Sequence, residues 1–147
     1  MKILPRSEFF GEFAVPGDKS ITHRAVMLNA AAEGEALITG ALTGEDCLST
    51  VSCMRALGAK IERDGDRIRV VGAPAFADGQ TLYCGNSGTT MRLLAGLLAG
   101  RNVRAVLTGD PSLSKRPMER VAAPLRVLGA EVRTQNGFAP IEIGPAA

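Results

Sequence analysis

Apolar and polar residues follow two different spacings in the first half of the chain, and each spacing predicts its own kind of element. Short apolar stretches predict strands at EFAV (12–15) and ALITGA (36–41). Between them, apolar residues recur at helical spacing. Ser20 is the expected N-terminal cap of this helix, and Gly34 is its expected end. The apolar positions of the helix are Ile21, Ala25, Leu28 and Ala32.

A second helix and a hairpin follow in the pattern. Asp46 is the expected cap of the helix, and Gly58 is its expected end. The apolar positions of this helix are Leu48, Val51 and Leu57. The segments AKIER (59–63) and RIRVV (67–71) then alternate on either side of an Asp-Gly-Asp turn, which is typical of a β-hairpin.

The second half of the chain repeats the first at an offset near 70 residues. The matching positions are Gly17 with Gly85, Arg24 with Arg92, 38–40 with 107–109, and 57–59 with 128–130. Four matches in the same order favour duplication of one unit. The chain is therefore predicted to contain two βαβαββ units, about 1–78 and 79–147, in an α+β (mixed α/β) fold of mixed sheets and helices on a shared core.

The same order of elements is expected in the second unit. The predicted segments are TLYC (81–84), a helix over 88–99, RAVLTG (104–109), a helix over 117–128, AEVRT (130–134) and PIEI (140–143). Pro117 suits the first turn of the last helix. Pro124 removes one hydrogen bond inside that helix, so we expect a kink in one helix rather than two helices.

Composition narrows the class of protein. With 147 residues, 46% hydrophobic and 22% charged, the chain is expected to fold as one domain or part of one. No stretch of about 18 apolar residues occurs and the N-terminus lacks an apolar signal region, so a soluble, cytoplasmic protein with no membrane partner is predicted. Cys47, Cys53 and Cys84 are interpreted as reduced core thiols.

Charge points to a small anionic ligand. A net charge of +2 and 4% aromatic residues argue against a nucleic-acid partner. Residues 101–133 nevertheless carry 7 basic and 3 acidic side chains. A local basic excess of this size suits a small anion better than a polyanion.

Two glycine-containing polar segments, Pro16–Ser20 and Gly85–Thr90, come immediately before predicted helices. The N-terminus of a helix offers unpaired N–H groups and about half a positive charge, so it attracts phosphate or carboxylate. Lys19 lies in the first segment, and Arg24 and Arg92 lie about one turn into the helices. These features predict an anion-binding site. A nucleotide-binding phosphate loop is disfavoured because Asp18 separates Gly17 from Lys19.

A third candidate element is the loop 109–118, in which Lys115 and Arg116 precede Pro117. An arginine followed by proline is suited to act as a rigid clamp on an anion. His23, the single histidine, is interpreted as a surface residue or a support for neighbouring groups rather than a catalytic base. No nucleophile triad and no metal-ligating acidic pair is indicated, so neither metal nor cofactor is expected.

Three segments together resemble the 5-enolpyruvylshikimate-3-phosphate synthase family of the shikimate pathway. They are PGDKSITHR (16–24), GNSGTTMR (85–92) and GDPSLSKRPM (109–118), in family order, with GED at 44–46 between the first two. The resemblance covers practically the whole chain and implies the enolpyruvyl transferase fold. Family members are about three times longer, with two domains of three such units and a cleft between them, so this chain resembles their N-terminal third.

The resemblance implies roles for named residues. Lys19, Ser20 and Arg24 are expected to contact shikimate 3-phosphate and phosphoenolpyruvate, with Lys19 nearer the latter and catalytic. The residues expected to line the phosphoenolpyruvate pocket, where glyphosate competes, are Asn86, Gly88, Thr89 and Arg116. Arg92 is a weaker match that is also open to a structural interpretation.

The family reaction is an enolpyruvyl transfer in aromatic amino acid biosynthesis. The 5-hydroxyl of shikimate 3-phosphate adds to phosphoenolpyruvate, and phosphate is released. The family's proton-transfer residues lie in the second half of its sequence, so this chain is expected to be inactive alone and to need a complementary C-terminal fragment.

Two alternatives stay open at this level. A non-catalytic anion-binding or complementation module would have the same basic loops. The sister family, UDP-N-acetylglucosamine enolpyruvyl transferase, typically has Lys-Asn where this chain has Lys19-Ser20, and it carries a reactive cysteine in a loop that here, at 109–117, contains none.

Overall fold

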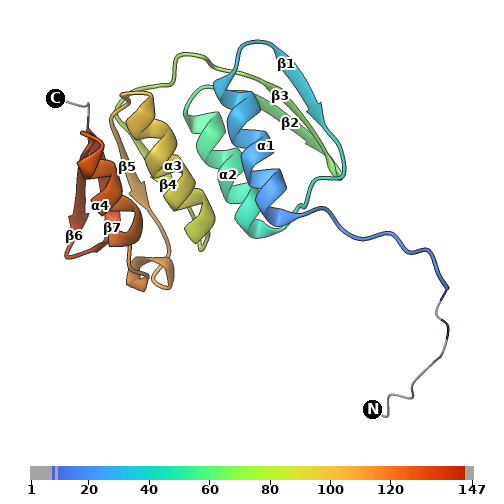
Figure 1. The fold of residues 1–147 in the computed structure, drawn as a ribbon. Coiled ribbons are helices and arrows are strands. Elements are labelled where there is room, and N and C mark those ends of the chain that lie inside the picture. The colour runs from blue at the N-terminus through green and yellow to red at the C-terminus, as the bar shows by residue number, and fades with distance from the viewer. Residues whose placement is uncertain (1–7, 9, 145–147) are drawn as a thin grey trace.

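Two β-sheets, each with helices packed on one face, make up the fold (Figure 1). The computed structural model describes residue 8 and residues 10–144. In the first half, the elements are α1 (Lys19–Ala31), β1 (Glu35–Ile38), α2 (Glu45–Ala56), β2 (Lys60–Asp64) and β3 (Arg67–Val71). The predicted hairpin is confirmed: β2 and β3 pair antiparallel, with Asp64 opposite Arg67. Gly65 has a φ of 56°, which glycine adopts without strain.

The second half contains the predicted βαβαββ order. Its elements are β4 (Gln80–Tyr83), α3 (Gly88–Gly100), β5 (Ala105–Thr108), a short 3-10 helix (Leu113–Lys115), α4 (Glu119–Val127), β6 (Glu131–Gln135) and β7 (Phe138–Gly144). The sheet order is β4-β5-β7-β6. Strand β4 runs parallel to β5, and the other pairs are antiparallel.

The two sheets share one topology. The first has the order β1-β3-β2, and the second contains the order β5-β7-β6. In both sets of three strands, the strand that comes last along the chain lies between the other two. This correspondence supports the α+β fold of tandem units. The boundary between 78 and 79 stays a prediction.

The strand predicted at 12–15 is wrong. Residues 10–17 form an extended arm that leads away from the sheets (Figure 1), and no strand in the described part of the chain pairs with it. Apolar alternation is not enough for a strand, because a strand is stable only when its backbone groups have partners. The first sheet therefore has three strands, without a counterpart of β4.

Helix α1 differs from the expectation in its cap and in its buried face. Asp18, not Ser20, caps it: the Asp18 Oδ1 atom accepts a hydrogen bond from the N–H of Ile21 at 2.7 Å. Ile21 and Leu28 are 62% and 66% exposed. The buried positions are Thr22, His23, Val26, Met27, Ala30 and Ala31. Both faces of α1 carry apolar residues, and packing against α2 and β3 decides which is buried.

Two further helix boundaries were predicted incorrectly. Gly44 rather than Asp46 is the cap of α2, and Asp46 lies in the first turn, where the helix dipole favours a carboxylate. Helix α4 begins at Glu119, so Pro117 precedes it instead of starting it. Met118, just before the helix, is buried, and its N–H donates a hydrogen bond to the Gly137 carbonyl at 2.7 Å. Pro124 lies inside a single helix, as predicted.

The core forms between the helices and the inner faces of the two sheets. Its largest fully buried side chains come from helices as well as strands: Met54, Leu57, Ile68, Leu82, Met91, Leu94, Leu98, Leu107, Leu113, Met118 and Ile141, together with His23. The prediction of helices packed in the core is confirmed. Cys47, Cys53 and Cys84 are buried free thiols, as predicted.

Candidate functional site

The first turns of three helices lie together at one end of the molecule. The Lys19 ammonium on α1 is 2.8 Å from the Asp46 carboxylate on α2. The Thr90 hydroxyl on α3 is 3.2 Å from the Asp46 carbonyl oxygen. The predicted anion-binding segments at 16–20 and 85–90 are therefore brought to the same place, although they are far apart in sequence.

A tight turn and a side-chain cap form the N-terminus of α3. Gly85 has a φ of 57°, and Ser87 caps the helix by accepting the N–H of Thr90 at 3.1 Å. The Asn86 side-chain oxygen accepts a hydrogen bond from Arg116. Arg116 comes from the predicted basic loop, so the third candidate segment joins the first two here.

Gly88 is the first residue of α3 and lies beneath two guanidinium groups. A Cβ atom at this position would lie 2.5 Å from Arg92 Nη1 and 3.4 Å from Arg116 Nη1. Arg92 also donates a hydrogen bond to the Pro117 carbonyl at 3.2 Å. Arg92 therefore has a structural contact and also contributes positive charge beside the helix N-terminus.

Lys19 belongs to the same cluster. Its side chain is 48% exposed, and its pKa is raised, chiefly by the hydrogen bond to the Asp46 carboxylate. The positive charge of Arg116 opposes this rise. We call Lys19, Asn86, Gly88, Arg92 and Arg116 the cation cluster.

The remaining candidates lie at its margin. Ser20 and Arg24 are exposed on α1, and Thr89 is half-buried in the first turn of α3. Within the part of the chain that the structure describes, Arg24 makes no ion pair. The structure thus brings Lys19, Asn86, Gly88 and Arg116 together, but it does not connect Arg24 to them.

The basic excess of residues 101–133 does not form one patch. Arg104 pairs with Asp78, Arg126 with Glu119, and Arg133 with Glu131. Arg101 instead donates to the carbonyl groups of Pro74 and Ala31. Of this segment, Arg116 is the predicted site residue that reaches the cation cluster, so total charge was a poor guide to the site.

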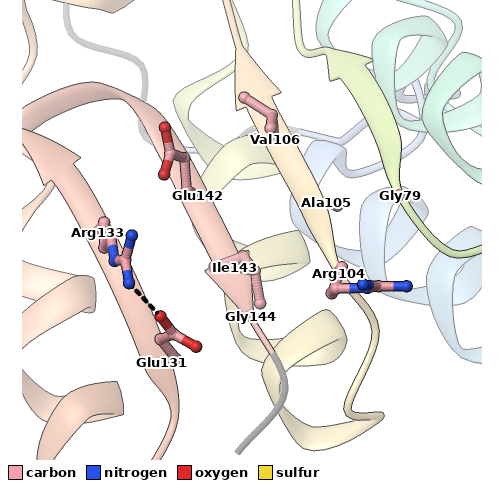
Figure 2. A pocket seen from close by; sticks show the side chains of 9 residues that line it. All are labelled: Gly79, Arg104, Ala105, Val106, Glu131, Arg133, Glu142, Ile143 and Gly144. Atoms are coloured by element: carbon pink, nitrogen blue, oxygen red, sulfur yellow. Dashed lines mark hydrogen bonds and ion pairs between the residues drawn. The ribbon is translucent and has the colours of Figure 1, made fainter.

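A pocket of about 300 Å³ lies elsewhere, on the second sheet (Figure 2). Its lining includes Val106, Glu142 and Arg133, which are paired across the adjacent strands β5, β7 and β6. They lie on the face of the sheet opposite the buried Ala105 and Ile143. Its arginines, Arg104 and Arg133, already pair with carboxylates. Because these charges are neutralised locally, the pocket has no free cation for an anionic ligand.

His23 is fully buried, which corrects the surface interpretation. Its Nδ1 atom is 2.6 Å from the Thr50 hydroxyl, and its Nε2 atom has no partner among the described residues. Burial lowers the pKa of His23; the charge of Asp46 opposes this effect, and that of Lys19 adds to it. The neutral imidazole is therefore the form that the fold favours.

The chain is expected to lose stability as the pH falls below about 6.5, the ordinary pKa of histidine. Between that value and the lowered pKa of His23, the unfolded chain binds more protons than the folded chain, so the free energy of unfolding falls by at most about 1.4 kcal/mol per pH unit. Urea unfolding between pH 7.5 and 5 measures this slope. The lowered pKa values of Glu35, Asp78 and Glu119 start from 4.5 or below, outside this window.

The control is His23→Gln, which removes the titrating ring. Its free energy of unfolding is expected to be lower at pH 7.5 but nearly flat across the same pH range. A slope in the variant equal to that of the parent chain would contradict the assignment to His23.

Sequence reasoning missed two features of this region. Asp46 was interpreted as a cap, yet its side chain pairs with Lys19, 27 residues away. Thr50 and Thr90 received no role, yet their hydroxyl oxygens lie 2.7 Å apart in the core. The position of Asp46 in the sequence signalled only the start of a helix, and no sequence signal pointed to the threonines.

Neither a metal site nor a membrane span is found where the structure could be searched. No group of three or more His, Cys, Asp or Glu side chains in the described residues could hold a metal ion. Among those residues, no helix is long and apolar enough to cross a membrane.

The fold defines a two-sheet α+β protein whose helix N-termini carry the cation cluster. Residues 4–146 match the family model for EPSP synthase (3-phosphoshikimate 1-carboxyvinyltransferase). The chain therefore belongs to the EPSP synthase family. This assignment replaces the UDP-N-acetylglucosamine alternative.

Named relatives agree with the family assignment. The 3-phosphoshikimate 1-carboxyvinyltransferase of Roseiflexus sp. (strain RS-1) is 52% identical over 96% of this chain and 34% of its own length. The enzyme of the same name from Staphylococcus haemolyticus is 48% identical over 97% of this chain and 34% of its own length. A solved structure of EPSP synthase from Acinetobacter baumannii superposes with a TM-score of 0.82 at 46% identity, over 91% of this chain and 32% of the other. The chain thus spans about a third of these relatives.

Proposed function

We propose that this chain is part of an enzyme that transfers the enolpyruvyl group of phosphoenolpyruvate to the 5-hydroxyl of shikimate 3-phosphate. The observation that carries the proposal is the cation cluster at the helix N-termini. Arg92 and Arg116 lie over the Gly88 backbone, and Lys19 is held by Asp46, whose carbonyl oxygen lies 3.2 Å from the Thr90 hydroxyl in the first turn of α3. Both substrates bear phosphate and carboxylate groups, which such a cluster binds.

Each predicted site residue has a role consistent with its place. Lys19, kept protonated by Asp46, offers a mobile ammonium for phosphoenolpyruvate. Arg116, held by Asn86, offers a planar pair of donors to a carboxylate or phosphate. Gly88 and Thr89 supply the helix end. Ser20 and Arg24, on the exposed side of α1, contact shikimate 3-phosphate in this proposal.

The chemistry requires charge stabilisation above all. The 5-hydroxyl loses its proton as its oxygen adds to C2 of phosphoenolpyruvate and C3 is protonated; the adduct then loses a proton from C3 and expels phosphate, which re-forms the double bond. Fixed cations stabilise the charge that develops on the leaving phosphate. Lys19 and Arg116 are suited to stabilise this charge, and the proton-transfer groups are supplied by the remainder of the enzyme. In this proposal, the protein works in the cytoplasm and needs no cofactor.

An exposed apolar face supports the need for a complementary C-terminal fragment. Ile21 and Leu28 lie on the outer face of α1, and Leu93 is partly exposed on α3. Neighbouring large apolar side chains on a surface are characteristic of interfaces. We propose that the rest of the synthase covers them and completes a cleft above the cation cluster.

The chain alone is expected to release no phosphate from shikimate 3-phosphate plus phosphoenolpyruvate, because the proton-transfer groups are missing. Addition of the C-terminal part of a synthase such as the Roseiflexus relative is expected to restore turnover. Lys19→Met is expected to abolish the restored turnover, whereas Lys60→Met, at an exposed lysine on β2, leaves it unchanged. The measurement is phosphate release over time.

Two results would contradict this function. Turnover by the isolated chain that Lys19→Met removes would show that the fragment is complete by itself. Failure of every reconstituted pair, with phosphate still bound near Lys19, would favour the alternative of a non-catalytic anion-binding module.

A further inference from the structure

A row of short hydrogen bonds crosses the core from α1 to the N-terminus of α3. His23 Nδ1 lies 2.6 Å from Thr50 Oγ1 on α2, and Thr50 Oγ1 lies 2.7 Å from Thr90 Oγ1 on α3. Thr90 Oγ1 in turn lies 2.7 Å from Ser87 Oγ, the cap of α3. All four side chains are buried. We call His23, Thr50, Thr90 and Ser87 the buried relay.

The acceptors at the far end favour one direction for these bonds. The Thr90 hydroxyl has one hydrogen, and its neighbours there are Ser87 Oγ, which already accepts the Thr90 N–H, and the Asp46 carbonyl oxygen, which can only accept. When Thr90 donates to either of them, its oxygen accepts from Thr50. Thr50 must then accept from His23 Nδ1–H.

The unpartnered Nε2 atom of His23 favours the same direction. If Thr50 donated to Nδ1, the ring proton would be on Nε2, where the described residues provide no acceptor. A buried N–H group without a partner is rarer and costlier than a buried lone pair. Both ends of the relay therefore indicate a neutral His23 with its proton on Nδ1.

The relay ends beside the residues that form the cation cluster. Ser87 lies between Asn86 and Gly88 in sequence and caps their helix. Asp46, whose carbonyl lies 3.2 Å from the Thr90 hydroxyl, holds Lys19 through its side chain. His23 lies on α1, four residues after Lys19. The His23–Thr50 and Thr50–Thr90 bonds thus link α1 to α2 and α2 to the first turn of α3, and the Thr90–Ser87 bond lies within the cap of α3.

We propose that His23, Thr50 and Thr90 are positioning residues that hold the first turns of α1 and α3 in register, so that Lys19 and the α3 N-terminus act on one substrate. The inference deepens the proposed function and rests on it for the identity of that substrate. Apolar side chains would fill the same space without ordering the helix starts, whereas directional hydrogen bonds fix their relative rotation.

The first test is the ring of His23, whose NMR signals are unambiguous because the chain has one histidine. The ¹⁵N shifts of the two ring nitrogens distinguish the tautomers. The proposal expects the Nδ1–H form at pH 7.5. A dominant Nε2–H form would overturn the direction of the relay and with it the proposal.

The second test removes the central hydroxyl with Thr50→Val, which keeps the shape of the side chain. Amide exchange at Thr22 and Thr90, in the first turns of α1 and α3, is expected to accelerate about tenfold. Thr50→Ser is expected to restore it, and the matched control Ser52→Ala, an exposed hydroxyl on the same helix, to leave it unchanged. Amide exchange in the β2–β3 hairpin is the reference. Unchanged exchange there shows that the effect of Thr50→Val is local, whereas faster exchange there shows a general loss of stability.

Inorganic phosphate is the ligand probe, titrated while amide shifts at 17–24 and 85–92 are followed. Thr50→Val is expected to weaken phosphate binding about tenfold, and Thr50→Ser to restore it. Unchanged exchange and unchanged affinity in Thr50→Val would overturn the proposal. If the exchange and tautomer results hold but the reconstituted synthase has no turnover, the relay is supported and the proposed function alone fails.

Discussion

Gly88→Ala is expected to weaken glyphosate inhibition of the reconstituted synthase at least about tenfold, while the KM for phosphoenolpyruvate rises about threefold or less. The new methyl group would lie 2.5 Å from Arg92 Nη1 and 3.4 Å from Arg116 Nη1. The Arg92 guanidinium must move, whereas the Arg116 guanidinium is met at ordinary contact distance, so the methyl group changes the shape of the cation cluster chiefly through Arg92. The bulkier inhibitor depends more on that space than the substrate does.

The backbone of Gly88 does not require glycine. Its φ lies outside the left-handed region, and alanine suits the first turn of a helix. Thermal melts of the isolated chain are therefore expected to shift little. Gly96→Ala, on the same helix with no atom within 4 Å of the added Cβ, is the matched control and should leave inhibition unchanged. Unaltered glyphosate inhibition with a clearly lowered Tm would remove Gly88 from the site.

Gly72→Ala is expected to be the most damaging glycine substitution for folding. A Cβ atom there would lie 1.8 Å from the carbonyl oxygen of Ala32 and 2.7 Å from that of Asn29. These are backbone atoms at the end of α1, so no side-chain rotation relieves the clash. We expect a loss of about 3 kcal/mol in the free energy of unfolding, measured in urea.

Gly96→Ala again provides the comparison. The added methyl meets nothing and lies inside α3, so it is expected to raise the free energy of unfolding by about 0.5–1 kcal/mol. Equal stability of the Gly72→Ala chain and the parent chain would show that the end of α1 is not held against Gly72.

Local rules were sufficient where a segment depends on its own neighbours. The alternation of 59–63 and 67–71 around a glycine turn specified the β2–β3 hairpin, and the same reasoning found every α-helix and strand of the second half, though not its short 3-10 helix. The three motif segments were also enough to indicate the family. In these cases the signal is local, because turn geometry and helical or strand periodicity are properties of adjacent residues.

The glycines show where local rules reach their limit. The repeat pairs Gly17 with Gly85, but the physical reasons differ. Gly85 has a φ of 57°, whereas a Cβ on Gly17 would lie 2.0 Å from the Gly40 carbonyl oxygen. The sequence marks both positions as requiring glycine, and only the fold shows that one needs its backbone conformation and the other needs space.

What the sequence determined by itself was the order of elements, most of the repeat and the residue types of an anion site. What the tertiary structure alone decided was which apolar face of α1 is buried, that 12–15 has no strand partner, and which charges meet. Lys19 with Asp46, and Thr50 with Thr90, are joined across 27 and 40 residues. Contacts at such separations depend on how helices pack, and no local pattern of residues encodes that packing.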